Sequence, residues 1–283
     1  MKSASIFARR KSSIIALYVA AGLAALIWLV PFLGVFMASI RPLSEISRGW
    51  WRFEQFNPTL RNYVGAWNHP AAPLGKGMLN SLRVAIPATI LPLAIASIAA
   101  YGFARFRFRL RDLLFMAVVA LMTLPQQMIA VPIYRIMRGL GAVDSYTGLI
   151  LVHAAWGLPW IMYFMRNYFT TVPIEVEEAA KVDGASDLRV FLQIVMPMSL
   201  PAVASAAVLQ FMWVWSDFFL ALILLYSPDK LLATQRVPLL RGVYHVDWGI
   251  LSAGSVIVMA VPIIVFALMQ RYYIRGMVGW TSK

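Results

Sequence analysis

Residues 178–201 read EAAKVDGASDLRVFLQIVMPMSLP, a polar stretch in an otherwise apolar chain. Acidic residues gather in this stretch and just before it, at Glu175, Glu177, Glu178, Asp183 and Asp187. Elsewhere, clusters of charge are separated by mostly apolar runs of ~20 residues or more, long enough to cross ~30 Å of hydrocarbon. The composition agrees, because 61% of the 283 residues are hydrophobic and 13% are charged, against roughly half and a quarter in soluble domains. The sequence therefore predicts an all-α integral membrane protein.

The apolar runs predict six membrane-spanning helices. These spans are placed at about 13–38, 78–103, 113–134, 147–166, 200–226 and 248–271. Prolines occur inside several of them, which bundled membrane helices tolerate because neighbouring helices satisfy the freed carbonyls. The first run is too long for the ~7–15 residue core of a cleaved signal peptide, so it is expected to stay as an anchor.

The orientation of the chain is predicted from its two densest basic clusters, at 2–11 and 105–111. Short cytoplasmic loops of membrane proteins are rich in Lys and Arg, so both clusters are expected in the cytoplasm. The transmembrane domain then covers 13–271, with a cytoplasmic N-terminus at 1–12, a cytoplasmic loop at 172–200 and a cytoplasmic tail at 272–283. Both termini are thus expected in the cytoplasm of a bacterial cell, and the chain in its cytoplasmic (inner) membrane.

Several kinds of chemistry are not expected from this sequence. The chain has no Cys, and its three His are not spaced like metal ligands. The nearest approach to a phosphate-binding loop is LGKG at 74–77, but Pro70 and Gly77 stand where Gly and Ser or Thr are required. These residues are therefore expected to form a plain loop. The net charge of +13 is explained by loop residues that set orientation, so nucleic acid is not an expected partner. We expect no metal, no cofactor and no enzymatic activity in this chain.

The polar stretch itself is predicted to form a helix, a turn and a second helix. The first helix covers 174–182, opening after Pro173 with carboxylates at its N-terminal end, where the helix dipole favours anions. Gly184 is a suitable left-handed C-terminal cap, and Ser186 or Asp187 can cap a second helix that runs to about residue 195. Apolar side chains on this hairpin need a surface to cover them, which a simple connecting loop does not explain.

The stretch resembles the EAA motif of the membrane permease subunits of bacterial ABC importers. The matching residues are Glu178, Ala179, Ala180, Asp183, Gly184, Ala185, Phe191, Ile194 and Pro197. In that family the motif forms a coupling helix that docks into a groove of the ATPase subunit. The resemblance implies that Glu178 makes a polar contact, that Ala179 and Ala180 pack closely against the ATPase, and that Gly184 forms the turn. Met196 departs from the usual Leu.

The resemblance extends over nearly the whole chain and narrows the family. Five further stretches look like carbohydrate-importing permeases, in particular the six-span subunit of maltose-type importers. They are SIRPLSEI (39–46), NSLRVAIPATI (80–90), AAYGFARFRFRLRDLLF (99–115), VDSYTGLIL (143–151) and WSDFFLALIL (215–224). This implies an ABC type I importer bundle in a heterodimer with a second permease, two ATPase subunits that bind ATP and Mg²⁺, and a periplasmic solute-binding protein. It also implies a carbohydrate substrate and alternating access driven by ATP.

Substrate-pathway residues are proposed on the fifth span, at Trp213, Trp215 and Asp217. Trp213, Asp217 and Leu220 are spaced to share one helix face, so an aromatic ring and a carboxylate are candidates to line the sugar pathway. The alternative is an interfacial aromatic belt with Asp217 bonded to a neighbouring helix.

The outer loop at 227–247 matches a segment that in relatives projects toward the binding protein. The candidate contacts that it supplies are Arg241, Tyr244 and His245.

Basic residues on the outer side raise the hypothesis of an acidic cargo, such as an oligouronate. The alternative is that these arginines dock an acidic binding protein or lipid phosphates. A permease of the glycerol-phosphate type is a further alternative. A different class, a carrier or channel that works without an ATPase, is also retained, although its spans would hold few ionisable residues.

Overall fold

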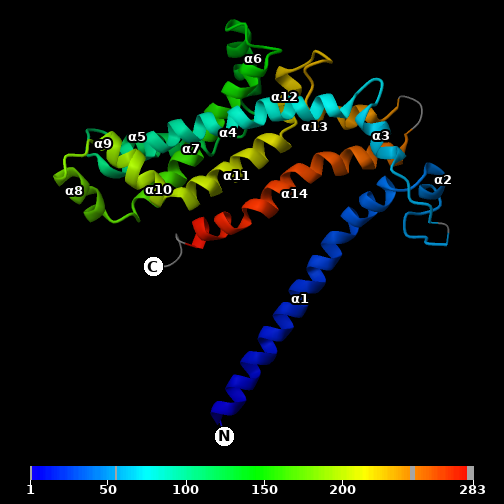
Figure 1. Ribbon diagram of the computed structural model, residues 1–283, viewed down its shortest axis with the longest axis horizontal. Helices are drawn as coiled ribbons and strands as arrows, with labels where there is room; N and C mark the ends of the chain where they lie inside the picture. Colours follow the sequence, from blue (N-terminus) through cyan, green and yellow to red (C-terminus); the bar gives the residue numbers. More distant parts are fainter. Residues whose placement is uncertain (1, 55, 243–245, 279–283) are drawn as a thin grey trace. The chain divides into compact units, whose positions relative to one another are not determined.

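The computed structural model describes residues 2–54, 56–242 and 246–278, with side chains described from residue 14 to residue 270 within those ranges. All regular secondary structure in these residues is helical, which confirms the predicted all-α fold class (Figure 1). The chain divides into two units, one of Met1–Ala71 with Leu240–Ile257 and the other of Ala72–Leu239 with Val258–Lys283.

The first unit contains the long N-terminal helix α1 and the segment that follows it. Its helices are α1 (Lys2–Ser39), α2 (Leu43–Ile46), α3 (Arg61–Trp67) and the first turns of α14 (Trp248–Val278). The side chains of α1 are exposed from Ile14 to Leu33, and an apolar surface of this kind is suited to lipid or to another subunit. Asn62 of α3 donates to the carbonyls of Ser39 (3.0 Å) and Arg41 (2.7 Å) and so fixes the chain where α1 ends.

The second unit is a bundle formed by three long helices, α4 (Leu74–Arg105), α7 (Tyr146–Phe169) and α11 (Leu200–Ser216). Small buried residues of α4, such as Ala88 and Ala96, let these helices approach closely. Two apolar clusters fill the interior, one toward each end of the bundle. In Figure 1, α8 lies by the C-terminal end of α4 and α13 by its N-terminal end.

Shorter helices complete the second unit. They are α5 (Arg111–Leu121), α6 (Ala130–Gly139), α8 (Ile174–Val182), α9 (Asp187–Val190), the π-helix η1 (Phe191–Val195), α10 (Met196–Met198), α12 (Phe219–Leu224), α13 (Ala233–Arg236) and the 3₁₀-helix η2 (Pro238–Leu240), whose last residue belongs to the first unit.

Among the described residues, four helices are long and apolar enough to cross a membrane. They are Ile14–Ser39, Leu74–Arg105, Tyr146–Phe169 and Trp248–Gln270. A fifth span is obtained if Asp187–Met198 and Leu200–Ser216, which meet at a bend of 77°, are counted together. The predicted span at 113–134 is instead two short helices, α5 and α6, separated by turns around Pro125. The count of six spans therefore stays a prediction.

The predicted loop at 74–77 is wrong, because these residues form the first turn of α4. Gly77 has a packing role there. A Cβ atom at this position would lie 2.5 Å from Cδ of Arg236 and 3.1 Å from the backbone of Ala233. Only a residue without a side chain lets α13 approach α4 this closely.

Side chains of α11 satisfy two carbonyls that prolines free in neighbouring helices. Pro92 has no N–H to offer the carbonyl of Ala88, and Nε2 of Gln210 donates to that carbonyl at 3.2 Å. Pro262 leaves the carbonyl of Val258 free in the same way, and Nε1 of Trp215 donates to it at 3.1 Å. The two kinks are thus built into the bundle, as the sequence predicted in general terms.

A Gln210→Leu variant is expected to destabilise the bundle by about 1–2 kcal/mol. Gln210 is fully buried, and its Oε1 also accepts from Nε1 of Trp160 at 3.0 Å. An apolar side chain of similar size leaves both partners unsatisfied. The apparent unfolding midpoint in detergent measures the effect. Gln127→Leu, at an exposed position, is the matched control, and an equal change in both variants would contradict the role of Gln210.

Candidate functional site

The polar stretch forms a helical hairpin whose turn is a Schellman motif. Gly184 adopts the left-handed conformation (φ +85°). Its N–H bonds to the carbonyl of Lys181 (3.0 Å), and the N–H of Ala185 bonds to that of Ala180 (2.9 Å). These two bonds satisfy carbonyls that the end of α8 leaves free. The predicted bounds of α8 and the predicted cap at Gly184 are confirmed.

The second arm of the hairpin begins at Ser186, which accepts a hydrogen bond from the N–H of Arg189 (3.4 Å). The helical path then continues through α9, η1 and α10 to Met198, so the predicted second helix is also confirmed. Lys181 and Asp187 form an exposed ion pair between the two arms, with Nζ 2.6 Å from Oδ1. Such exposed pairs stabilise a structure by only ~0–1 kcal/mol, so this contact contributes little to the stability of the hairpin.

A buried ion pair anchors the first arm to the bundle. Glu177 is 2% exposed and lies 2.6 Å from Nη2 of Arg105, the last residue of α4. Tyr101 donates to the second carboxylate oxygen (3.0 Å), and Arg105 also donates to the carbonyl of Val172 (2.8 Å). Sequence reasoning missed this network, because it treated Glu177 only as an anion at a helix N-terminus.

The second arm is anchored by an aromatic cluster. The buried ring of Phe191 lies with its centroid 5.0 Å from that of Tyr101 and 6.3 Å from that of Phe169. Both arms therefore converge on Tyr101, one through a carboxylate and the other through a ring. This double attachment fixes the direction of the hairpin relative to α4 and α7.

The rest of the hairpin presents an exposed surface that is partly apolar. Val182 is 87% exposed and Leu188 is 64% exposed. Among the residues of the predicted coupling set, exposed positions are Glu178, Ala179, Asp183, Gly184 and Pro197, whereas Ala180 and Ala185 are half-buried. Phe191, also in that set, points into the interior. The motif thus consists of an exposed group and an internal anchor. We call the exposed group, together with Val182 and Leu188, the hairpin surface.

The predicted pathway residues lie where α11 ends. Trp213 is half-buried, whereas Trp215 is buried, with its ring stacked on Phe211 at 5.8 Å between centroids. Asp217 is buried, and its Oδ2 lies 3.7 Å from Nε2 of His153. Sequence reasoning did not single out His153, because a lone His in an apolar span carries no local signal.

The prediction that Trp213, Asp217 and Leu220 share one helix face is wrong. The helix ends at Ser216, and Asp217 has extended backbone angles (φ −67°, ψ 133°). Its Oδ2 accepts from the N–H groups of Leu220 (3.1 Å) and Ala221 (3.2 Å) at the start of α12. A carboxylate that bonds to its own downstream backbone competes with helix continuation, so the span breaks here.

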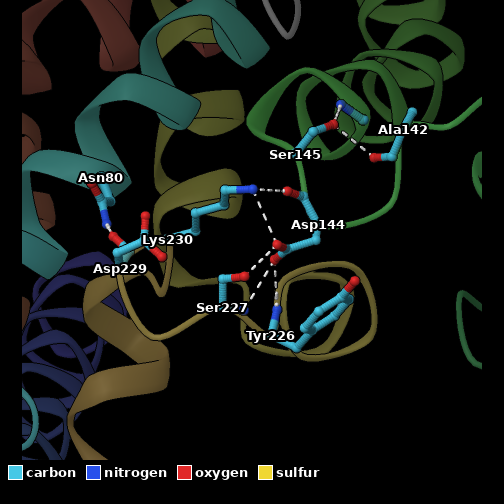
Figure 2. Close-up of polar contacts among 9 residues, drawn as sticks. Asn80, Ala142, Asp144, Ser145, Tyr226, Ser227, Asp229 and Lys230 are labelled. Carbon is cyan, nitrogen blue, oxygen red and sulfur yellow. Dashed lines mark hydrogen bonds and ion pairs between the residues drawn. The ribbon is translucent and has the colours of Figure 1, made fainter.

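A second polar cluster ties the α6–α7 connection to the segment after α12 (Figure 2). Asp144 has a positive φ of 55°, and its N–H donates to the carbonyl of Leu224 (2.7 Å). Its carboxylate accepts from the N–H groups of Tyr226 (3.1 Å) and Ser227 (3.0 Å), from the Ser227 hydroxyl, and from Nζ of Lys230 (3.0 Å). Asp144 thus fixes residues 226–230.

The protonation states of this cluster favour the ion pair. Burial alone would raise the pKa of the Asp144 carboxyl, but the hydrogen bonds from Ser227, Tyr226 and Lys230 outweigh it and lower that pKa well below its usual range. The hydrogen bond to Asp144 in turn raises the pKa of the Lys230 ammonium group. Both groups are therefore charged from mildly acidic to alkaline pH.

An Asp144→Asn variant is expected to lose about 1–3 kcal/mol of stability at neutral pH. Because folding lowers the carboxyl pKa, its contribution is complete above the unfolded value of about 3.9 and disappears as the pH falls through the lower folded value. The difference between variant and parent in apparent unfolding midpoint should shrink on strong acidification. A difference that persists unchanged at low pH would contradict this account. Asp229→Asn is the control, because the carbonyl rather than the carboxylate of Asp229 accepts from Asn80 (2.9 Å).

The predicted contacts of the outer loop are only partly described. Arg241 is exposed. Tyr244 and His245 lie outside the described residues. The earlier part of this loop is folded onto the second unit, where the buried Arg236 donates to the carbonyls of Leu231 (3.1 Å) and Pro228.

Comparisons with known proteins agree on one family. The family described as binding-protein-dependent transport system inner membrane component matches residues 82–279. A probable ABC transporter permease protein of Pyrococcus horikoshii is 57% identical over 256 residues, which cover 90% of this chain and 93% of the relative. The trehalose/maltose transport system permease protein MalG of Thermococcus litoralis is 31% identical over 281 residues, with 95% and 96% covered.

The fold is also found among solved structures. A chain of a bacterial ABC transporter involved in the import of the acidic polysaccharide alginate superposes with a TM-score of 0.79 at 23% identity, covering 92% of this chain and 95% of that chain. At this identity the likeness shows the fold alone. Together with the family match, these relatives show that the chain belongs to the family of binding-protein-dependent transport system inner membrane components, as a permease subunit of an ABC transporter and not an enzyme.

Proposed function

We propose that this chain is the inner-membrane permease of an ATP-driven importer that moves an oligosaccharide or a sugar derivative into the cell. A periplasmic solute-binding protein delivers the substrate, and a second permease completes the pathway as a heterodimer. Two separate ATPase subunits bind ATP and Mg²⁺, because this chain has no phosphate-binding loop of its own. Both termini and the hairpin lie in the cytoplasm.

The observation that carries the proposal is the hairpin surface. Apolar side chains as exposed as Val182 and Leu188 need a partner surface, while the buried Arg105–Glu177 pair and Phe191 hold the hairpin rigidly to the bundle. A rigid, exposed hairpin transmits the closure of an ATPase dimer to the membrane helices as a rigid-body movement. The same features fit a carrier or channel without an ATPase poorly, because such a protein has no use for this surface.

The substrate pathway is proposed near the break between α11 and α12. Trp213 is the most accessible of the three predicted residues, whereas Trp215 and Asp217 already have partners within the chain. We therefore assign sugar stacking to Trp213 and give Trp215 and Asp217 the role of shaping the helix ends around it. Arg241, Tyr244 and His245 are proposed to face the binding protein.

A carbohydrate cargo is supported by the name of the Thermococcus litoralis relative, a trehalose/maltose transport system permease protein. Reconstituted vesicles that contain this chain, a partner permease and the ATPase test the proposal. Uptake of a neutral maltodextrin is expected only when ATP, the ATPase and the binding protein are all present. Uptake without the ATPase would contradict the proposal and favour the carrier.

The same vesicles separate a neutral cargo from an acidic one. Oligouronates and maltodextrins are compared as stimulators of ATP hydrolysis, with charge as the main difference between them. Stimulation by maltodextrins but not by oligouronates would exclude the acidic-cargo hypothesis. The reverse result would favour an acidic cargo, for which the outer arginines are candidate contacts.

A further inference from the structure

A polar pocket lies directly after α1, in the segment that leads to α3. It has a volume of about 110 Å³ and is lined by Arg41, Glu45, Arg48, Arg52 and Glu54. This space exceeds the need of one water molecule. Three guanidinium groups and two carboxylates leave the lining with a net positive charge.

Arg41 is an unusual residue for such a pocket because it is only 1% exposed. Its Nη1 donates to the carbonyl of Arg52 (2.6 Å). Its Nε and Nη2 are buried and have no hydrogen-bond partner within the described part of the chain. Buried donors on a charged group are costly when left unsatisfied, so this side chain indicates a missing acceptor.

The guanidinium group of Arg41 is held in place from several sides. Its Cζ lies 5.4 Å from the ring centroid of Phe53 and 4.8 Å from that of Phe56, within the range of cation–π contacts. Its backbone carbonyl accepts from Asn62 (2.7 Å). The nearby carboxylate of Glu45 is already engaged, since it accepts from the side chain (2.8 Å) and the N–H (3.4 Å) of Asn57. The two free donors of Arg41 are thus preorganised for an external oxyanion.

We propose that this pocket binds the phosphate group of a phospholipid headgroup. Arg41 supplies two N–H donors in a fixed plane, a geometry that matches phosphate oxygens, and Arg52 adds a second positive charge at the rim.

The position in the chain selects a lipid over a soluble anion. Arg41 follows by two residues the end of Ile14–Ser39, a helix long and apolar enough to span a bilayer, so it lies at the depth of the headgroups. Around it, the side chains of Trp51, Phe53 and Phe56 are exposed, and aromatic side chains of this kind favour the membrane interface. The site therefore anchors the outer end of α1 to one leaflet.

The proposal is tested with the full-length chain, delipidated in a non-ionic detergent and titrated with defined lipids. Native mass spectrometry counts the bound lipids, and tryptophan fluorescence gives a dissociation constant. Three probes separate the sources of the anion: dioleoylphosphatidylglycerol, dioleoylglycerol without phosphate, and glycerol phosphate without acyl chains. We expect saturable binding of the phospholipid, with binding by the other two probes at least about tenfold weaker.

Variants identify the pocket as the site. Arg52→Gln, which removes one positive charge, is expected to weaken phospholipid binding by about tenfold, and Arg41→Gln, which removes a charge and two N–H donors, by at least about tenfold. Arg52→Gln is the decisive variant, because its side chain is exposed and its carbonyl still accepts from Arg41. Arg61→Gln, an exposed arginine of the same unit outside the pocket, should bind like the parent chain.

Three results would overturn the proposal. Dioleoylglycerol binding as tightly as the phospholipid would mean that acyl chains alone decide. Glycerol phosphate binding equally well would assign the pocket to a soluble anion. Unchanged phospholipid binding in Arg52→Gln and Arg41→Gln would place the lipid elsewhere.

Discussion

A Val182→Asp variant is expected to lose ATP-driven uptake by at least about tenfold while the chain folds and inserts normally. Val182 is 87% exposed, so its side chain contributes little to the chain's own packing, and exposed substitutions usually change stability by about 0.5 kcal/mol or less. In the proposed complex, however, Val182 packs against the ATPase. A carboxylate there is desolvated without a partner, and every 1.4 kcal/mol lost weakens the complex about tenfold.

Two measurements check this prediction. Co-purification of the ATPase with a tagged permease reports docking, and uptake in vesicles reports coupling. Leu140→Asp is the matched control, because Leu140 is 67% exposed and lies after α6, outside the hairpin. ATPase binding is expected to fall in Val182→Asp only. Full transport by this variant would remove the hairpin from the coupling pathway.

Local features of the hairpin could be predicted because each depends on residues close in sequence. The cap at Gly184 requires only that a glycine follow a helix, and the start at Ser186 requires only a hydroxyl before one. The apolar spans were equally accessible, since hydrophobic length is a property of the sequence itself. The polar stretch also resembles the EAA motif of a known family, and the family match confirms the family that this resemblance named.

Interactions over a long sequence distance were not predictable in this way. Glu177 and Arg105 are 72 positions apart, and nothing in either neighbourhood signals the other. The same holds for Asp144 and Lys230, which meet only because the bundle brings two loops together. The break at Asp217 was missed for another reason. Apolar residues continue across it, so the hydrophobic pattern hid a carboxylate that bonds to the following backbone.

The largest effect on stability is expected at Glu177, because this side chain is buried against the bundle. A Glu177→Ala variant is expected to lose about 3–5 kcal/mol of unfolding free energy, because the charge of Arg105 stays buried without its partner. The Arg105 side chain is only 10% exposed, and the Tyr101 hydroxyl also loses its acceptor. The apparent unfolding midpoint in detergent should fall far below that of the parent chain.

The adjacent glutamate provides the control that separates anchoring from docking. Glu178 is exposed, so Glu178→Ala should leave the unfolding midpoint nearly unchanged and weaken only ATPase binding. An Arg105→Met, Glu177→Leu double variant should recover most of the stability lost in Glu177→Ala, because no unpaired charge remains buried. If Glu177→Ala and Glu178→Ala reduced the midpoint equally, the buried pair would not be the anchor of the hairpin. If Glu177→Ala alone loses stability, the two glutamates have different roles: Glu177 holds the hairpin to α4, and Glu178 contacts the ATPase.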